Sequence, residues 1–175
     1  MSKSKDKLNF KIRNVKIDDI REVYDLLVAN RPYVGLNSRY TYLLLARDFS
    51  DTCVVVEYDG KIVAFSSGYI PPSRADTFFS WESVVHRDYR GHSLQKRMLL
   101  YQISMTNVKY LEGTVNPSNK VTQRNLCKLA EMLHAKCEKR LLFKEEDFEN
   151  DDHEAEILYR IGPISKNQMR QLTTL

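Results

Sequence analysis

The dipeptide Asp59-Gly60 constrains the fold of this chain more than any other feature. It separates two runs rich in β-branched and aromatic residues, 53–58 and 61–65. An Asp-Gly pair accepts the left-handed backbone that a tight hairpin turn requires, so the two runs are predicted to be neighbouring antiparallel strands. A purely parallel sheet is therefore not expected.

Periodicity and capping residues predict the other elements. A helix is expected to start at Asp18 or Asp19 and to end at Arg31-Pro32, because the residue before a proline avoids the helical region. Ser38 is a favourable N-cap for a second helix, which runs to about Asp48. Further strands are predicted over 10–15, 77–85, 108–115, 136–143 and 156–161, and helices over 93–105 and 119–134. The order β-α-α-β-β-β-α-β-α-β-β indicates an α/β protein in the broad sense, an α+β mixed sheet of about seven strands with flanking helices.

Length and composition limit the organisation of the chain. With 175 residues it can bury one core of ordinary size. We expect a flexible leader over 1–8, a single domain over 9–165 and a C-terminal tail over 166–175. No apolar run approaches the roughly 18 residues of a membrane span, and the opening residues lack a secretory core, so a cytoplasmic protein is expected.

Neither a metal nor a nucleic acid is indicated. The three cysteines, Cys53, Cys127 and Cys137, lack metal-ligand spacing and lie in apolar stretches, which favours buried free thiols. The net charge of +4 is spread along the chain, so neither a nucleic acid nor a membrane is an expected partner.

The segment 81–99 carries most of the functional information. It is predicted to be a strand, a polar turn and a helix whose first turn is flanked by basic residues. The first amides of a helix have no partner inside the helix, and the helix dipole places partial positive charge there, so a pyrophosphate binds well at such a point. Alternatively, the segment is a basic surface loop that caps an amphipathic helix. The basic residues are Arg87, Arg90, Lys96 and Arg97.

This segment resembles the acetyl-CoA loop of the GNAT acetyltransferases, in which an arginine, two residues, a glycine, one residue and a second small residue precede the helix. The matching positions are Arg90, Ser93 and Gln95. Gln95 departs most, because it places a long side chain where the pyrophosphate approaches the backbone. The resemblance implies a GNAT fold, acetyl-CoA as co-substrate, and cofactor contacts from Val84, Val85, Arg90, Gly91, Ser93, Leu94, Gln95, Lys96 and Asn119.

Three more segments resemble the diaminobutyrate acetyltransferases of ectoine synthesis, and the likeness extends from Phe10 to about Ile164. These segments are 36–55, 67–81 and 153–163. The resemblance implies acetyl transfer to the side-chain amine of L-2,4-diaminobutyrate. It implies substrate contacts from Asn37, Ser38, Tyr40, Trp81, Thr114 and His153. Two positions depart from the family pattern: Gly35 stands where an aspartate is usual, and Glu82 where a glutamine is usual.

The chemistry requires an unprotonated amine, because a protonated alkyl amine with a pKa near ~10 cannot attack a thioester. Glu82 is the candidate general base or water-positioning residue, and Tyr40 is the candidate acid. The alternatives are an outward-facing Glu82 and a solvated His153. By resemblance, the backbone amide of Val84 or Val85 stabilises the oxyanion.

Two rival functions remain at this stage. Gly35 and Glu82 also fit an N-acetyltransferase of another diamino acid or of a polyamine. Gln95 fits a degenerate, non-catalytic GNAT binding module. A homodimer is expected from the apolar residues late in the chain.

Overall fold

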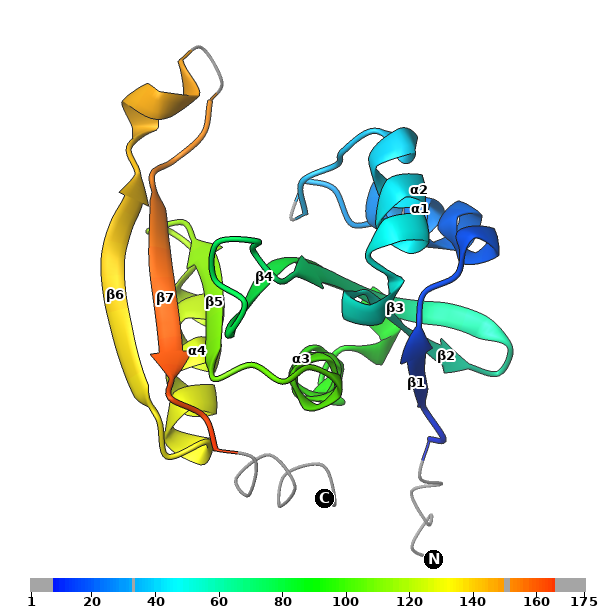
Figure 1. Ribbon diagram of the computed structural model, residues 1–175. Coiled ribbons are helices and arrows are strands. Elements are labelled where there is room, and N and C mark those ends of the chain that lie inside the picture. Colours follow the sequence, from blue (N-terminus) through cyan, green and yellow to red (C-terminus); the bar gives the residue numbers. More distant parts are fainter. Residues whose placement is uncertain (1–7, 33, 150–151, 166–175) are drawn as a thin grey trace, which may run out of the picture.

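The computed structural model describes residues 8–32, 34–149 and 152–165, so the predicted tail and all of the predicted leader except Leu8 lie outside the described residues. Within these ranges, one mixed sheet has the strand order β1-β2-β3-β4-β5-β7-β6 (Figure 1). The strands are β1 (Lys11–Asn14), β2 (Val54–Tyr58), β3 (Lys61–Tyr69), β4 (Thr77–Val85), β5 (Tyr110–Val115), β6 (Lys136–Phe143) and β7 (Glu156–Gly162). The helices are α1 (Ile20–Ala29), α2 (Arg39–Asp48), α3 (Leu94–Met105) and α4 (Lys120–Met132). This order confirms the predicted fold class.

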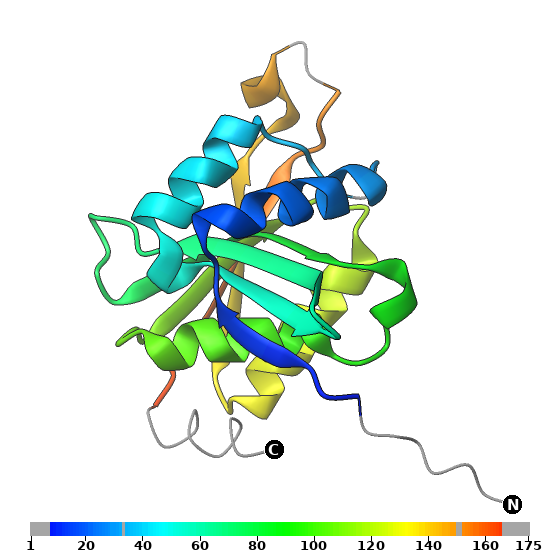
Figure 2. The same ribbon diagram turned by 90° about the vertical axis from the view of Figure 1, so that its right-hand side faces the viewer.

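The first four strands form an antiparallel meander. The predicted hairpin joins β2 to β3, and its turn residues Asp59 and Gly60 have φ of 50° and 71°, as the Asp-Gly pair predicted. Helices α1 and α2 cover one face of this half of the sheet, and α3 covers the other (Figure 2). Because both faces are covered, β2 is buried along most of its length.

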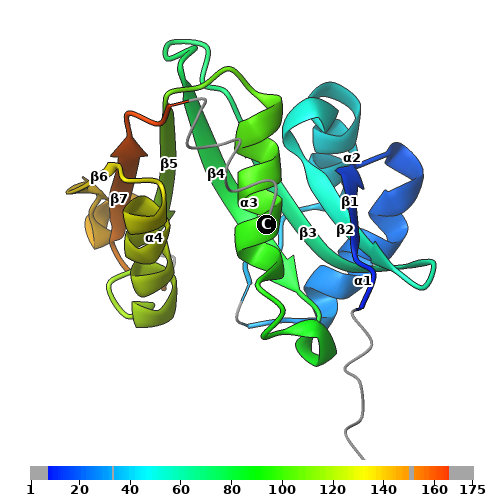
Figure 3. The ribbon, with the colours of Figure 1, turned by 90° about the horizontal axis from the view of Figure 1, so that it is seen from below.

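The C-terminal half is an antiparallel group in which β7, the last strand, lies between β5 and β6. Helix α4 packs on one face of this group, with Leu129 and Leu133 against Leu111 and Ile161 (Figure 3). The buried carboxylate of Glu112, 2% exposed, forms ion pairs with Arg74 and Arg160. These pairs tie β5 to β7 and to the segment before β4.

The sheet divides between β4 and β5, its one parallel pair of strands among the described residues. They pair only from Thr77 with Tyr110 to Ser80 with Gly113, whereas β4 continues to Val85 (Figure 3). At the same point β4 has a bulge at Trp81, since Ser67 pairs with Glu82 and Gly68 pairs with Ser80. A bulge increases the local twist and redirects the following side chains, so the two strands diverge here.

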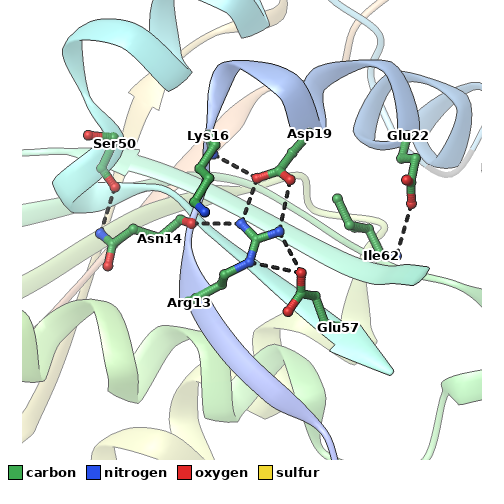
Figure 4. Close-up of polar contacts among 8 residues, drawn as sticks. All are labelled: Arg13, Asn14, Lys16, Asp19, Glu22, Ser50, Glu57 and Ile62. Atoms are coloured by element: carbon green, nitrogen blue, oxygen red, sulfur yellow. Dashed lines mark hydrogen bonds and ion pairs between the residues drawn. The ribbon is translucent and has the colours of Figure 1, made fainter. Parts of the chain in front are cut away.

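One predicted capping residue acts differently in the structure. Asp19 directly precedes α1, but its side chain accepts no hydrogen bond from that helix. Its carboxylate accepts from the backbone amide of Lys16 at 2.7 Å and from the Arg13 guanidinium, which also binds Glu57 (Figure 4). Burial opposes ionisation of Asp19, but these hydrogen bonds outweigh burial and lower its pKa. Asp19 therefore occupies the predicted N-cap position of α1 without making the side-chain hydrogen bond of a cap.

The cysteines are all free. Cys53 is buried, as predicted, but Cys127 and Cys137 are only partly buried. No group of three or more His, Cys, Asp or Glu within the described ranges is arranged to hold a metal ion. In the same part of the chain, no helix is both long and apolar enough to cross a membrane.

Candidate functional site

Glu82 lies directly after the β4 bulge and is turned toward α2. Its Oε2 accepts a hydrogen bond from the Tyr42 hydroxyl at 3.0 Å. Burial raises the pKa of Glu82 to about 7, although the hydrogen bond from Tyr42 acts in the opposite direction. A carboxyl group with such a pKa exchanges protons readily near neutral pH, which suits a general base. Because its carboxylate makes this contact, Glu82 is not an outward-facing strand glutamate.

Tyr42 was not among the predicted site residues. It is fully buried on α2, and its hydroxyl accepts a hydrogen bond from the Asn37 backbone amide at 3.2 Å while it donates to Glu82. Burial raises the pKa of Tyr42 to about 12, so the hydroxyl stays protonated and remains a donor. A signal was available: a buried tyrosine hydroxyl needs a polar partner, so a tyrosine among the core residues of a helix indicates one nearby.

Ser67 faces Glu82 across the β3–β4 pair. Directly paired residues of antiparallel strands project to the same face, so the Ser67 hydroxyl and the Glu82 carboxylate share the α2 side of the sheet. Ser67 is fully buried, and its Oγ has no hydrogen-bond partner within the described part of the chain. Such a hydroxyl is the usual attachment point for a bound water or for a polar atom of a ligand.

The C-terminal end of β4, beyond the point where β4 and β5 diverge, has backbone groups without a partner on β5. Val84 pairs with Phe65 and Val85 with Ala64 on β3, but neither has a partner on β5. Along a strand, successive amides point alternately to its two sides, so one of these two amides points toward the split. This amide is a donor of the kind that the predicted oxyanion site requires.

The predicted phosphate loop has the shape that an anion site needs. Gly91 and Ser93 adopt left-handed backbone conformations, with φ of 84° and 57°, and α3 begins at Leu94. The first bond of the helix runs from the Arg97 amide to the Ser93 carbonyl at 3.0 Å. The amides of Leu94, Gln95 and Lys96 therefore have no partner inside the helix.

The side chains around this loop differ in their exposure and in their hydrogen-bond partners. Gln95 is exposed, Lys96 is partly exposed, and Leu94, 2% exposed, anchors the helix in the core beneath α3. Arg90 binds neighbouring protein groups: its Nη2 donates to Asn30 Oδ1 at 2.8 Å and its Nε to the Val85 carbonyl at 3.4 Å. Asn119 caps α4, where its Oδ1 accepts from the Thr122 amide at 3.1 Å.

The predicted substrate residues are spread over several elements. Ser38 caps α2 by accepting from the Thr41 amide at 3.2 Å, and Tyr40 is 68% exposed. Trp81 is 45% exposed and packs edge-on against Tyr69. The remaining three residues are Asn37, whose backbone amide donates to Tyr42, Thr114, partly buried on β5, and His153, stacked on Phe148 in the β6–β7 connection. That connection extends beyond the sheet on the side of β6, apart from α2 (Figure 1). Glu82 and Asn37 are thus brought together through Tyr42, whereas His153 lies on a separate projection.

Comparison with known proteins decides the family. The model of the acetyltransferase (GNAT) family matches residues 20–120, which include the Tyr42–Glu82 contact and the phosphate loop. The chain belongs to the GNAT acetyltransferase family. Two similar relatives are L-2,4-diaminobutyric acid acetyltransferases. That of Halalkalibacterium halodurans is 37% identical over 85% of this chain and 79% of its own length. That of Virgibacillus pantothenticus is 40% identical over 76% of this chain and 86% of its own length.

Solved structures agree with this GNAT assignment. The diaminobutyrate acetyltransferase EctA from Paenibacillus lautus, in complex with L-2,4-diaminobutyric acid and coenzyme A, superposes with a TM-score of 0.83. It is 31% identical, and the match covers 89% of this chain and 96% of that one. Ard1 from Thermoplasma volcanium, 17% identical with a TM-score of 0.70 over 87% of this chain and 97% of its own, shares the fold.

Proposed function

We propose that this GNAT protein transfers the acetyl group of acetyl-CoA to the side-chain amine of L-2,4-diaminobutyrate, the acetylation step of ectoine synthesis. One observation carries the proposal: nearly the whole chain superposes on an enzyme solved with this amino acid and coenzyme A. The Tyr42–Glu82 pair beside the split in the sheet, in which Tyr42 is buried and Glu82 partly buried, supplies the base that such a transfer needs.

The described backbone fits acetyl-CoA at two places. The free amides at the start of α3 receive the pyrophosphate, and the split between β4 and β5 receives the arm that carries the thioester. The amide of Val84 or Val85 donates to the carbonyl oxygen as negative charge develops on it. These donors are backbone amides. They are therefore present even though Gln95 stands where the GNAT pattern has a small residue.

Glu82 removes the proton that blocks the reaction. A side-chain ammonium is almost fully protonated at pH 7, whereas Glu82, with a pKa of about 7, is about half ionised there. Glu82 takes one proton from the ammonium, directly or through a water held by Ser67. The amine nitrogen then bonds to the carbonyl carbon, the carbon–sulfur bond breaks, and the second proton of the nitrogen passes to the departing thiolate, directly or through water, which gives the neutral amide and the CoA thiol. The thiol of CoA has a pKa near ~8.5, so its thiolate is a good leaving group and needs no dedicated acid such as Tyr40.

A second candidate is acetylation of another diamino acid or of a polyamine. Space at Gly35 favours it, since a side chain added there would meet nothing within 4 Å. Gly35 therefore leaves open the space that the side chain of the usual aspartate would occupy. A substrate panel separates the candidates: CoA release is measured with 2,4-diaminobutyrate, ornithine, lysine and simple diamines. The first proposal expects the highest kcat/KM for 2,4-diaminobutyrate, and a higher value for any other amine would replace it.

We propose, further, that the protein is a cytoplasmic homodimer with a single domain over 9–165. Strand β6 is at the edge of the sheet and leaves Leu141 and Phe143 about half exposed, with 51% and 47% of their surfaces accessible. Apolar side chains on an uncovered edge strand favour contact with a second copy. Light scattering coupled to gel filtration tests the dimer, and Leu141→Glu is expected to shift the mass toward the monomer.

A further inference from the structure

A buried asparagine connects the end of the first helix with the phosphate loop. Asn30 directly follows α1 and is 5% exposed. Its Nδ2 donates to the Leu26 carbonyl at 2.8 Å, and its Oδ1 accepts from Arg90 Nη2 at 2.8 Å. Both polar atoms of the side chain are therefore used. Buried polar groups that are fully paired hold their neighbours in one arrangement, since a lost partner leaves a costly unpaired group.

Arg90 transmits this contact to the backbone. Its Nε donates to the carbonyl of Val85, the last residue of β4, so one guanidinium joins α1 to the point where β4 ends and the loop begins. The loop then passes through Gly91 and Ser93, both with positive φ, before α3 starts. A left-handed conformation at a serine is unfavourable and persists only where surrounding contacts maintain it.

The arginine of the acetyl-CoA loop is therefore already engaged by protein groups on the side of α1. We propose that Asn30 is a positioning residue for this loop: it holds Arg90, and Arg90 holds the turn that presents the first amides of α3 to acetyl-CoA. This inference rests on the proposed use of acetyl-CoA. It assigns Arg90 a supporting role within the protein, and it assigns Asn30 an effect on ligand binding that acts through Arg90.

The alternative arrangement makes the opposite prediction. If Arg90 left Asn30 to bind the pyrophosphate directly, the Asn30 contact would compete with the ligand. Removing the Asn30 side chain would then free the arginine and tighten coenzyme A binding. If Asn30 positions Arg90, the same change weakens binding. The sign of one measured effect therefore separates the two arrangements.

The test is a calorimetric titration of coenzyme A into the wild-type chain, Asn30→Ala, Arg90→Ala and the double variant. We expect each single change to raise the Kd by about tenfold, since each removes a hydrogen bond to a charged group. We expect the double variant to bind within about twofold of Arg90→Ala, because Asn30 acts through Arg90. Asn30→Asp keeps the acceptor for Arg90 and should bind more tightly than Asn30→Ala.

Kinetics give a second readout that a merely structural role would not produce. Asn30→Ala should raise the KM for acetyl-CoA while kcat changes little. Asn14→Ala is the matched control: Asn14 Nδ2 donates to the Ser50 carbonyl at 2.7 Å, so this variant loses an asparagine-to-carbonyl bond that involves neither Arg90 nor the loop (Figure 4). It should lower the unfolding temperature and leave the Kd for coenzyme A unchanged. If Asn30→Ala is too unstable to purify, Asn30→Asp and Arg90→Lys test the same contact, and Arg90→Lys should bind less tightly than wild type.

Three results would overturn the proposal: tighter binding by Asn30→Ala, unchanged binding by Asn30→Ala, or additive losses in the double variant. A wild-type chain that does not bind coenzyme A would overturn the proposed function itself, and the inference with it. The titration of the wild-type chain thus distinguishes the two failures.

Discussion

Two helices follow the two parallel strands, and they begin in different ways. Helix α4 follows β5 and is capped by its own Asn119, whose side chain binds the amide of Thr122. Helix α3 follows β4 and has Ser93 at the N-cap in a left-handed conformation, with no capping hydrogen bond from its side chain. A helix with such a cap has used part of its anion-binding capacity, whereas a helix without one keeps it. The difference favours the β4–α3 corner as the proposed pyrophosphate site.

The two strands that lead to these corners also differ. Strand β4 carries Glu82 toward α2, whereas β5 carries Thr114 near its end and holds its one carboxylate, that of Glu112, in ion pairs with two arginines. The proposed base and the proposed pyrophosphate site therefore both depend on β4 and the segment that follows it. The variants below test this division.

The largest effect is expected at Glu82. Glu82→Gln keeps the shape of the side chain but removes the base, so kcat/KM at pH 7 should fall by about 10²–10⁴-fold. Thr114→Val on β5 is the matched change and should cost less than tenfold. Steady-state CoA release measures both variants. Equal losses in the two would contradict the assignment of the base to β4.

Charge at the start of α3 should matter next. Ser93→Asp places a carboxylate beside the free amides and should weaken coenzyme A binding by about tenfold or more, because the carboxylate repels the pyrophosphate and caps the helix. Asn119→Ala should destabilise the protein by about 1 kcal/mol through the loss of its cap. If Asn119→Ala weakened coenzyme A binding as strongly as Ser93→Asp, α4 would share the pyrophosphate site and the comparison would fail.

Tyr42 should set the pH at which Glu82 works. The Tyr42 hydroxyl lowers the pKa of Glu82 against the larger effect of burial, so Tyr42→Phe should raise that pKa further. The rising limb of kcat/KM against pH, expected near pH 7 in the wild type, should move to higher pH. A rate loss with an unmoved limb would show that Tyr42 does not act through Glu82.

The smallest effect concerns stability against pH. Glu82 has a pKa of about 7 in the folded protein, above its ordinary value of 4.5, so the folded state binds more protons than the unfolded state between these two pH values. Stability contributed by its protonated form is therefore lost as pH rises from about 4.5 to 7. Asp19 acts in the opposite direction, because its lowered pKa contributes stability that is lost as pH falls. Urea titrations across this range should show a smaller decline in Glu82→Gln than in the wild type.

Local sequence determined much of this protein. The Asp59-Gly60 turn, the Ser38 cap and the limits of β4 and β6 are as predicted, because each depends on a few neighbouring residues. The proposed phosphate loop was also recognisable from the sequence, because it is one contiguous segment. Its donors are neighbouring backbone amides, so the local sequence is enough to indicate them.

Tertiary structure decided the rest. The position of β7 between β5 and β6, the Tyr42–Glu82 contact and the Arg90–Asn30 contact all join residues far apart in the sequence. Periodicity shows which side of an element is apolar, but it does not show which distant element covers that side. Neither Tyr42 nor Asn30 was therefore among the residues predicted for the site. Only the packed sheet, which buries both, shows the polar partners that burial makes necessary.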